Sequence, residues 1–183
     1  MLFRSHNGVD TSIWKPTYDD DAISRMGIDP KRPYVLFVGR ITRQKGLVHL
    51  LAAAHHFPPG VQIVFAASSP DEPGIGNEVS KGIAELSDKR PGDVIWLNTS
   101  VPKADLITLQ THATVFMCPS IYEPLGIVNL EAMACGTPVI ASDLPALIEA
   151  VGDAAELVSP ENVFDIARAL RALLLDQIGR AHV

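Results

Sequence analysis

The sequence predicts an α/β domain built on a doubly wound parallel sheet. Short apolar and β-branched runs alternate with segments of helical periodicity along the 183 residues. The runs are apolar throughout instead of alternating in polarity, which is typical of strands that helices cover on both faces. Apolar residues make up 47% and charged residues 20%, so the chain can bury the core of one ordinary domain.

Six strands and six helices are expected. The strands are predicted at residues 34–38, 61–66, 94–97, 114–118, 139–142 and 156–158. The first helix has Leu47, Leu50, Leu51 and Ala54 on one face, and the others are predicted at 78–89, 103–112, 127–135, 146–151 and 163–175. The Pro/Gly-rich segment 68–77 is expected to be a loop. Right-handed crossovers between the parallel strands favour a Rossmann-like strand order of 3-2-1-4-5-6.

The expected ligand site is the crevice between strands 1 and 4, which are neighbours in this order. The loop after strand 1 is Gly39-Arg-Ile-Thr-Arg-Gln-Lys-Gly46, and the loop after strand 4 spans residues 119–126. Both loops leave the carboxyl ends of neighbouring parallel strands. We therefore expect them to meet at this edge of the sheet.

The first loop has the features of a phosphate site. Gly39 lets the backbone leave the strand closely, Gly46 opens the next helix, and Arg40 and Lys45 bracket the turn. A helix amino terminus offers free N–H groups and basic side chains add charge, so the natural ligand is a phosphate or diphosphate. Each basic residue could instead be a solvated surface charge. The P-loop spacing is absent, and Gly74-Ile-Gly76 lacks the third glycine of a dinucleotide fingerprint and is expected to be a loop.

Two carboxylates accompany the second loop. Glu123 lies in the turn, and Glu131 lies in an expected helix, where its neighbours three and four residues away are Ile127, Val128, Ala134 and Cys135. A carboxylate on such an apolar face loses its water, so it needs a partner or a shifted pKa. One alternative is a structural ion pair or cap, and the other is a pair of acceptors for the hydroxyls of a ligand. A diphosphate between the two loops, with these carboxylates on either side, describes a nucleotide-sugar. Glu131 sits about 7 Å into its helix, a depth that suits contact with the ribose hydroxyls of such a ligand, while Glu123 would face the sugar that is transferred.

Composition excludes several classes of partner. The net charge of -6 gives no general attraction to nucleic acid or to anionic membranes. Two cysteines, Cys118 and Cys135, make neither a disulfide framework nor a zinc site, so we expect a reducing, cytoplasmic setting. There is no apolar run of 18 residues, and the first residues have no secretory h-region.

At these motifs the chain resembles the family-4 retaining glycosyltransferases of GT-B fold. Glu123 and Glu131 match the family's Glu-x7-Glu motif, and Arg40 and Lys45 match its basic donor motif. Within the family the chain looks most like the actinobacterial-type synthases of glycogen and maltose 1-phosphate. That resemblance rests on three segments, residues 7–11, 37–46 and 118–135. After Asp143 the chain reads Leu-Pro-Ala-Leu-Ile-Glu, where those synthases have a glycine-rich run.

The resemblance implies a role for each site residue. Arg40 and Lys45 would neutralise the leaving nucleoside diphosphate, and Glu131 would hold the ribose. Glu123 would hold the donor sugar, so Arg40, Lys45 and Glu123 are the expected catalytic residues. The expected donor-binding set is Gly39, Arg40, Lys45, Glu123, Leu125, Gly126, Ile127 and Glu131. Backbone near Leu125 and Gly126 would contact the phosphates, and the leaving phosphate would accept the proton of the acceptor.

The implied substrate is ADP-glucose or UDP-glucose, with no cofactor and no metal, and the implied acceptor is a glucan or glucose 1-phosphate. Two alternatives stay open. One is a mannosyl- or glucosyltransferase of the same family that acts on a lipid or a small glycoside. The other is a nucleotide-sugar-binding module without turnover.

The resemblance also implies that the chain is one half of a two-domain enzyme. Residues 34–177 are the expected donor-binding domain, and residues 1–33 an incoming segment from an N-terminal GT-B domain that the sequence lacks. The last residues, 178–183, are expected to be a non-native tail. Because the reaction lies in the cleft between two domains, the isolated chain is expected to be inactive.

Overall fold

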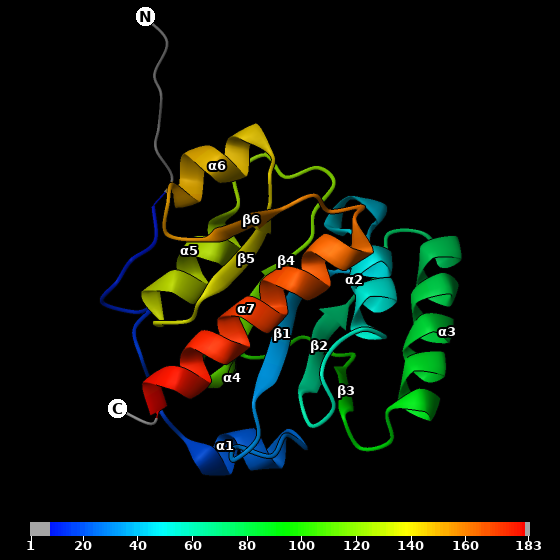
Figure 1. The fold of residues 1–183 in the computed structure, drawn as a ribbon, viewed down its shortest axis with the longest axis horizontal. Coiled ribbons are helices and arrows are strands. Elements are labelled where there is room, and N and C mark those ends of the chain that lie inside the picture. Colours follow the sequence, from blue (N-terminus) through cyan, green and yellow to red (C-terminus); the bar gives the residue numbers. More distant parts are fainter. Residues whose placement is uncertain (1–7, 182–183) are drawn as a thin grey trace, which may run out of the picture.

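The computed structural model describes residues 8–181, with side chains of the last helix described as far as Leu174. Six parallel strands form one sheet in the order β3-β2-β1-β4-β5-β6, which confirms the predicted order (Figure 1). The strands are β1 Tyr34–Arg40, β2 Gln62–Ser68, β3 Val94–Leu97, β4 Val115–Cys118, β5 Val139–Ser142 and β6 Glu156–Val158.

Helices connect the strands as the alternation predicts, and one further helix precedes β1. They are α1 Asp20–Arg25, α2 Leu47–Ala54, α3 Pro73–Lys89, α4 Lys103–His112, α5 Ile127–Ala134, α6 Pro145–Val151 and α7 Val163–Ala181, with a short 3₁₀ turn, η1, at Arg43–Lys45. Every strand lies within two residues of its predicted bounds.

Helix α3 is the clearest error in the predicted elements. It begins at Pro73, whereas the sequence predicted a loop over residues 68–77 that included Gly74-Ile-Gly76. Proline is well suited to the first position of a helix, because its missing N–H would have no intrahelical partner there. The two glycines follow in the first turn, where their low helix propensity hides the start of the helix.

Two cores cover the two faces of the sheet. Successive strand residues point to opposite faces, so Val35 and Phe37 lie in one core while Tyr34 and Leu36 lie in the other. The first core is closed by α2, α3 and α7, and Figure 1 shows α7 crossing over the middle strands. The second core is closed by α1, α4, α5 and α6. This is the covering of both faces that the continuous apolar strands predicted.

The segment before β1 packs against the same domain. Trp14 is buried against Ile107 and Cys135, and Ile23 of α1 is fully buried in the second core. The N–H of Asp19 donates to Nε2 of His112 at 3.0 Å. These contacts tie residues on both sides of the expected boundary at position 33 to one core. The origin of that segment in another domain stays a prediction.

The carboxyl-terminal end extends further in helical form than predicted. Helix α7 was expected to end at residue 175 and continues to Ala181. The expectation of a non-native tail concerns residues 178–183. The side chains of these residues lie outside the described part of the chain, and residues 182–183 lie outside it entirely. That expectation stays a prediction.

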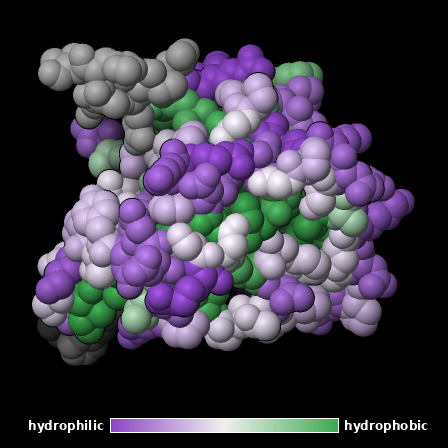
Figure 2. Space-filling model, turned by 90° about the horizontal axis from the view of Figure 1, so that it is seen from below, coloured by the Kyte–Doolittle hydropathy of each residue, from purple (hydrophilic) through white to green (hydrophobic). Residues whose placement is uncertain are grey.

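Apolar side chains are unevenly distributed on the surface. On the face shown in Figure 2, hydrophobic residues gather in a strip across the middle, bounded by hydrophilic residues. Within residues 8–181, no helix combines the length and the apolar character that crossing a bilayer requires.

Candidate donor site

The loops after β1 and β4 are in direct contact, as predicted. The carbonyl of Gln44 accepts hydrogen bonds from the N–H groups of Ile121 and Tyr122, at 2.9 and 3.3 Å. Gly46, at φ +64°, packs so closely on the other loop that a Cβ there would lie 1.8 Å from the carbonyl oxygen of Pro119. No side chain fits this contact. Glycine at position 46 therefore sets how closely the two loops approach.

The loop after β1 begins later than expected. Gly39 and Arg40 remain in β1, paired with Ala67 and Ser68 of β2. The prediction that Gly39 lets the backbone leave the strand closely is wrong, because Gly39 stays in β1 and a Cβ there would make only ordinary contacts, 3.4 Å from the Phe37 ring. Arg40 therefore lies at the carboxyl edge of the sheet, where its side chain is exposed.

Lys45 is aimed across the loop contact at Glu123. The Thr42 hydroxyl caps η1 by accepting from the Lys45 N–H at 3.3 Å, which fixes the end of the turn. Nζ of Lys45 then lies 2.5 Å from Oε2 of Glu123, and the two side chains are 28% and 7% exposed. The ion pair thus joins the two loops in a largely desolvated setting.

Glu123 is also bound by its own loop. Its Oε2 accepts from the Ser120 hydroxyl at 3.5 Å, and its Oε1 accepts from the Gly126 N–H at 3.3 Å. Burial raises the pKa of the Glu123 carboxyl, but the hydrogen bond and charge of Lys45, with the N–H groups of Gly126 and Leu125, outweigh burial. The net result is a pKa below the ordinary value, so Glu123 is a carboxylate at neutral pH.

Some of the N–H groups that were predicted to donate hydrogen bonds to phosphate are therefore bonded to Glu123 in this structure. The N–H groups of Leu125 and Gly126 were expected to face phosphate, and here both face the Glu123 carboxylate. Helix α5 starts directly after Gly126, which has φ +69° and no side-chain cap. The first N–H groups of a helix have no carbonyl partner within it, so Ile127 and Val128 supply the donors that remain at this helix end.

Glu131 has no partner among the residues that the structure describes. Its side-chain carboxylate accepts no hydrogen bond and forms no ion pair there, so neither the ion-pair nor the cap alternative applies to it. The side chain is half-buried, and this burial raises the pKa of the carboxyl; the charge of Lys103, at the start of α4, opposes the shift only in part. Glu131 thus presents a half-buried carboxyl group that accepts no hydrogen bond from the described residues.

A cavity of about 230 Å³ lies beside Arg40 at the same edge of the sheet. Val38, Val101 and Leu106 form its apolar walls, and Ser68 and the loop 99–101 add polar groups. The loop 99–101 follows β3, so it leaves the sheet at the edge that carries the two predicted loops.

Comparison with known proteins identifies the family. The family model described as "Glycosyl transferases group 1" matches residues 19–183. The chain belongs to this family. It is 51% identical over 150 residues to the α-maltose-1-phosphate synthase of Mycolicibacterium smegmatis, in an alignment that covers 80% of this chain and 38% of that protein. The chain thus spans well under half the length of this curated relative.

Solved structures show that the fold is that of a C-terminal domain in group 1 glycosyltransferases. The C-terminal domain of the group 1 protein LpcC from Francisella tularensis superposes with a TM-score of 0.76 at 24% identity, covering 93% of this chain and 89% of that one. Anabaena Alr3699/HepE, solved in complex with UDP-glucose, superposes with a TM-score of 0.81 at 23% identity, over 93% and 47% of the two chains.

In this group 1 glycosyltransferase domain, the predicted residues fall into two sets. Lys45, Leu125 and Gly126 each contact Glu123. Gly39 lies beside Lys45, and Ile127 follows Gly126 at the start of α5. Arg40 and Glu131 stand apart from that cluster, Arg40 at the cavity and Glu131 one turn along α5. Sequence reasoning missed Ser120 and the loop 99–101. The loop could have been found, since all carboxyl ends of a parallel sheet meet at one edge.

Proposed function

We propose that this chain is the donor-binding part of a retaining hexosyltransferase. The reaction would move glucose from a nucleoside-diphosphate sugar to a glucan or to glucose 1-phosphate. The similarity to α-maltose-1-phosphate synthase supports this substrate class. The observation that carries the proposal is the Lys45–Glu123 pair beside the open end of α5, with the unpartnered Glu131 one turn further along that helix.

Lys45 would hold the diphosphate while it keeps its contact with Glu123. An ammonium group has three N–H donors, and one of them is used by the carboxylate. The other two are left for a phosphate oxygen. Glu123 thereby orients Lys45, and Arg40 would bring a second, planar cation from the end of β1.

The nucleoside would lie between Arg40 and Glu131. A half-buried carboxylate with no partner is suited to accept hydrogen bonds from the two hydroxyls of a ribose. The cavity beside Arg40 has apolar walls at Val38, Val101 and Leu106 that suit the flat face of a base. UDP and ADP are the proposed nucleotides. UDP-glucose is the ligand named for the HepE structure of the same fold, and ADP is the other nucleotide that the family resemblance implies.

Catalysis would rest on fixed positive charge. Negative charge grows on the leaving diphosphate as the glycosidic bond breaks, so donors already held in place stabilise the transition state more than the ground state. Glu123, whose pKa lies below the ordinary value, is ionised. It would accept a hydrogen bond from a sugar hydroxyl and would not act as a proton donor. The leaving phosphate would take the proton of the acceptor.

Turnover would need an N-terminal GT-B domain to complete the cleft, since the relative is much longer than this chain. A nucleotide-sugar-binding module without turnover is the outcome proposed for the chain alone. Cys118 and Cys135 are both free thiols, in keeping with the proposed cytoplasmic setting.

Calorimetric titration with ADP, UDP and GDP tests the donor site. We expect one of the diphosphates to bind and Arg40→Ala to weaken it about ten-fold, or about 1.4 kcal/mol. Arg43→Ala is the matched control, because Arg43 is exposed and paired with Glu78 at 3.4 Å, away from the cavity. A folded wild-type chain that binds none of the three nucleotides would refute the proposal, as would equal losses in the two arginine variants.

A further inference from the structure

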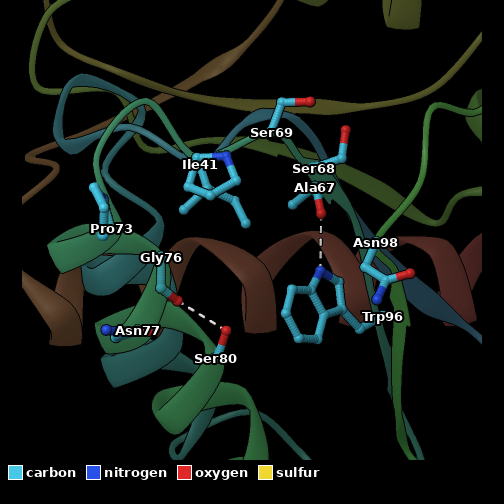
Figure 3. A pocket seen from close by; sticks show the side chains of 11 residues that line it. Ile41, Ala67, Ser68, Ser69, Pro73, Gly76, Asn77, Ser80, Trp96 and Asn98 are labelled. Atoms are coloured by element: carbon cyan, nitrogen blue, oxygen red, sulfur yellow. Dashed lines mark hydrogen bonds between the residues drawn. The ribbon is translucent and has the colours of Figure 1, made fainter.

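A second cavity lies on the other side of the end of β2 (Figure 3). It has a volume of about 310 Å³ and is bounded by the end of β2, the first turns of α3, and β3. This is at the small end of the range for ligand pockets, roughly 300–1,000 Å³. Ser68 borders both this cavity and the one beside Arg40, so the two are neighbours separated by the end of β2. The proposed donor function does not use the second cavity.

Hydrogen bonds hold the walls of this cavity in place. The Ile41 N–H donates to the Ser68 carbonyl at 3.1 Å, and the Asp71 N–H donates to the Ile41 carbonyl at 3.3 Å. Nε1 of Trp96 donates to the Ala67 carbonyl at 2.8 Å, which fixes the indole ring (Figure 3). These three hydrogen bonds fix the positions of the cavity walls relative to one another.

The turn between β2 and α3 is held in an uncommon conformation. Ser69 has φ 54°, in the left-handed region that residues with a side chain rarely adopt. Gly76 leaves room for Pro70, since a Cβ at position 76 would lie 3.0 Å from the proline ring. Strain of this kind persists where the surroundings fix it and is concentrated at binding and catalytic sites.

The lining combines apolar and polar groups and carries no charge among the described residues. Figure 3 shows the Trp96 ring with Asn98 beside it and with Asn77 and Ser80 across the opening on α3. No charged side chain lines the cavity among the described residues. Asp71 and Glu72 directly precede α3 and put negative charge near its amino end, which disfavours an anion there.

This combination suits a sugar ring. An aromatic side chain offers an apolar surface with one polar edge, and here the polar edge is already satisfied by Ala67. Amide and hydroxyl side chains can both donate and accept, as the hydroxyls of a sugar require. A nucleotide or a sugar phosphate would instead require basic groups.

We propose that this cavity binds one neutral hexopyranose unit, either a free sugar or the end of a glucan chain. The site is separate from the proposed donor site, and the proposal does not depend on that function. In a glucan-extending enzyme such a site would hold the polymer on the domain that carries the donor.

The indole N–H of Trp96 offers a direct measurement. Its nuclear magnetic resonance signal can be distinguished from that of Trp14 by its loss in Trp96→Phe. We expect the signal to shift on titration with glucose and with maltoheptaose, with dissociation constants on the order of 1 mM. Tighter binding of maltoheptaose would identify a glucan end as the ligand, and equal binding would identify a single hexose. Glucose 1-phosphate should bind more weakly than glucose.

Two serines of α3 provide a matched pair of variants. The hydroxyls of Ser80 and Ser87 each donate to the carbonyl four residues earlier, both at 2.8 Å, but Ser80 alone lines the cavity. Ser80→Ala and Asn98→Ala should lower the affinity for the sugar about five-fold or more, and Ser87→Ala should leave that affinity unchanged. Glu131→Gln, which is expected to weaken nucleotide binding, should likewise leave sugar binding unchanged.

Three results would overturn the proposal. They are an unmoved Trp96 signal with every sugar, equal affinities in Ser80→Ala, Asn98→Ala and Ser87→Ala, and displacement of the sugar by saturating ADP or UDP. Displacement would place the sugar in the donor site. Sugar binding in a chain that binds no nucleotide would sustain this proposal and refute the donor function, so the two fail separately.

Discussion

Nζ of Lys45 and Oε2 of Glu123 lie 2.5 Å apart across 78 residues of sequence, and their ion pair joins the loops after β1 and β4. The carboxylate is the more deeply buried partner, with 7% of its side chain exposed. Removal of one partner from such a pair leaves the other charge poorly solvated, which costs more than the net contribution of the intact pair.

The first prediction is a double-mutant cycle on this pair. Lys45→Met should lower the free energy of unfolding by about 1–3 kcal/mol, because it strands the buried Glu123 carboxylate. Lys45→Met in the Glu123→Gln background should cost much less, since no charge is then left behind. Urea unfolding of the four proteins gives the coupling, expected at about 1 kcal/mol or more. Additive single effects would mean that the pair contributes no coupling.

The second prediction concerns the pH dependence of stability. The pKa of Glu123 in the folded chain lies below its ordinary value of 4.5, so unfolding makes this carboxyl bind a proton more readily. Its contribution to stability is therefore fully present above about pH 4.5 and is lost as the pH falls through the folded pKa. Urea midpoints of wild type and Glu123→Gln should converge on acidification. A difference that does not change between pH 7 and the acid limit of folding would contradict this assignment.

The third prediction separates stability from function at Glu131. Burial raises the pKa of this carboxyl, so the ionised form is disfavoured in the folded chain, and stability falls as pH rises from 4.5 through the folded pKa. Glu131→Gln should therefore stabilise the ligand-free chain at neutral pH. The side chain is only half-buried, so the gain should be at most about 1 kcal/mol, or about 2–4 °C in Tm.

Glu131→Gln should also lower the affinity for the nucleotide about ten-fold, because an amide accepts fewer hydrogen bonds from ribose hydroxyls than a carboxylate does. Glu149→Gln, at an exposed position of α6, is the control and should change neither property. Thermal melts and calorimetric titration measure the two effects. A destabilised Glu131→Gln would show that the carboxylate has a structural role, and unchanged affinity would remove its ribose role.

The sheet and the loop contact could be predicted from the sequence because they depend on rules that act over whole elements. Continuous apolar strands require cover on both faces, and the handedness of the crossovers fixes the strand order. The pairing of individual charged groups could not be predicted in this way. Nothing in the order of residues says that Lys45 meets Glu123, or that the N–H groups of Leu125 and Gly126 turn to that carboxylate, because both depend on side-chain geometry within the loops.

The roles of the glycines show the same limit. Gly39 and Gly46 were expected to act together, yet only Gly46 has a positive φ and a backbone contact that excludes a side chain. A glycine at the end of a strand and a glycine at a loop crossing look alike in sequence. They differ in what lies next to them, and for Gly46 that neighbour is Pro119, which is 73 positions further along (119 minus 46).

The last prediction tests that contact. Gly46→Ala must relieve a Cβ placed 1.8 Å from the Pro119 carbonyl oxygen, in addition to the strain of a left-handed φ of +64°. Gly60→Ala is the matched control, because Gly60 has φ +82° and no atom within 4 Å of the added Cβ. The control should lose about 1–2 kcal/mol from backbone strain alone. Gly46→Ala should lose about 3 kcal/mol or more, since the clash with backbone adds to that strain.

Separation of the two loops should also reach the donor site. The clash in Gly46→Ala pushes Pro119 away from η1, so Lys45 and Glu123 can no longer keep their 2.5 Å contact. Nucleotide affinity should then fall about ten-fold or more in Gly46→Ala and stay unchanged in Gly60→Ala. Urea unfolding and calorimetric titration measure the two effects. Equal stability losses in the two variants would show that the Gly46–Pro119 contact relaxes freely, and normal affinity in Gly46→Ala would mean that the loop contact does not position the donor-binding groups.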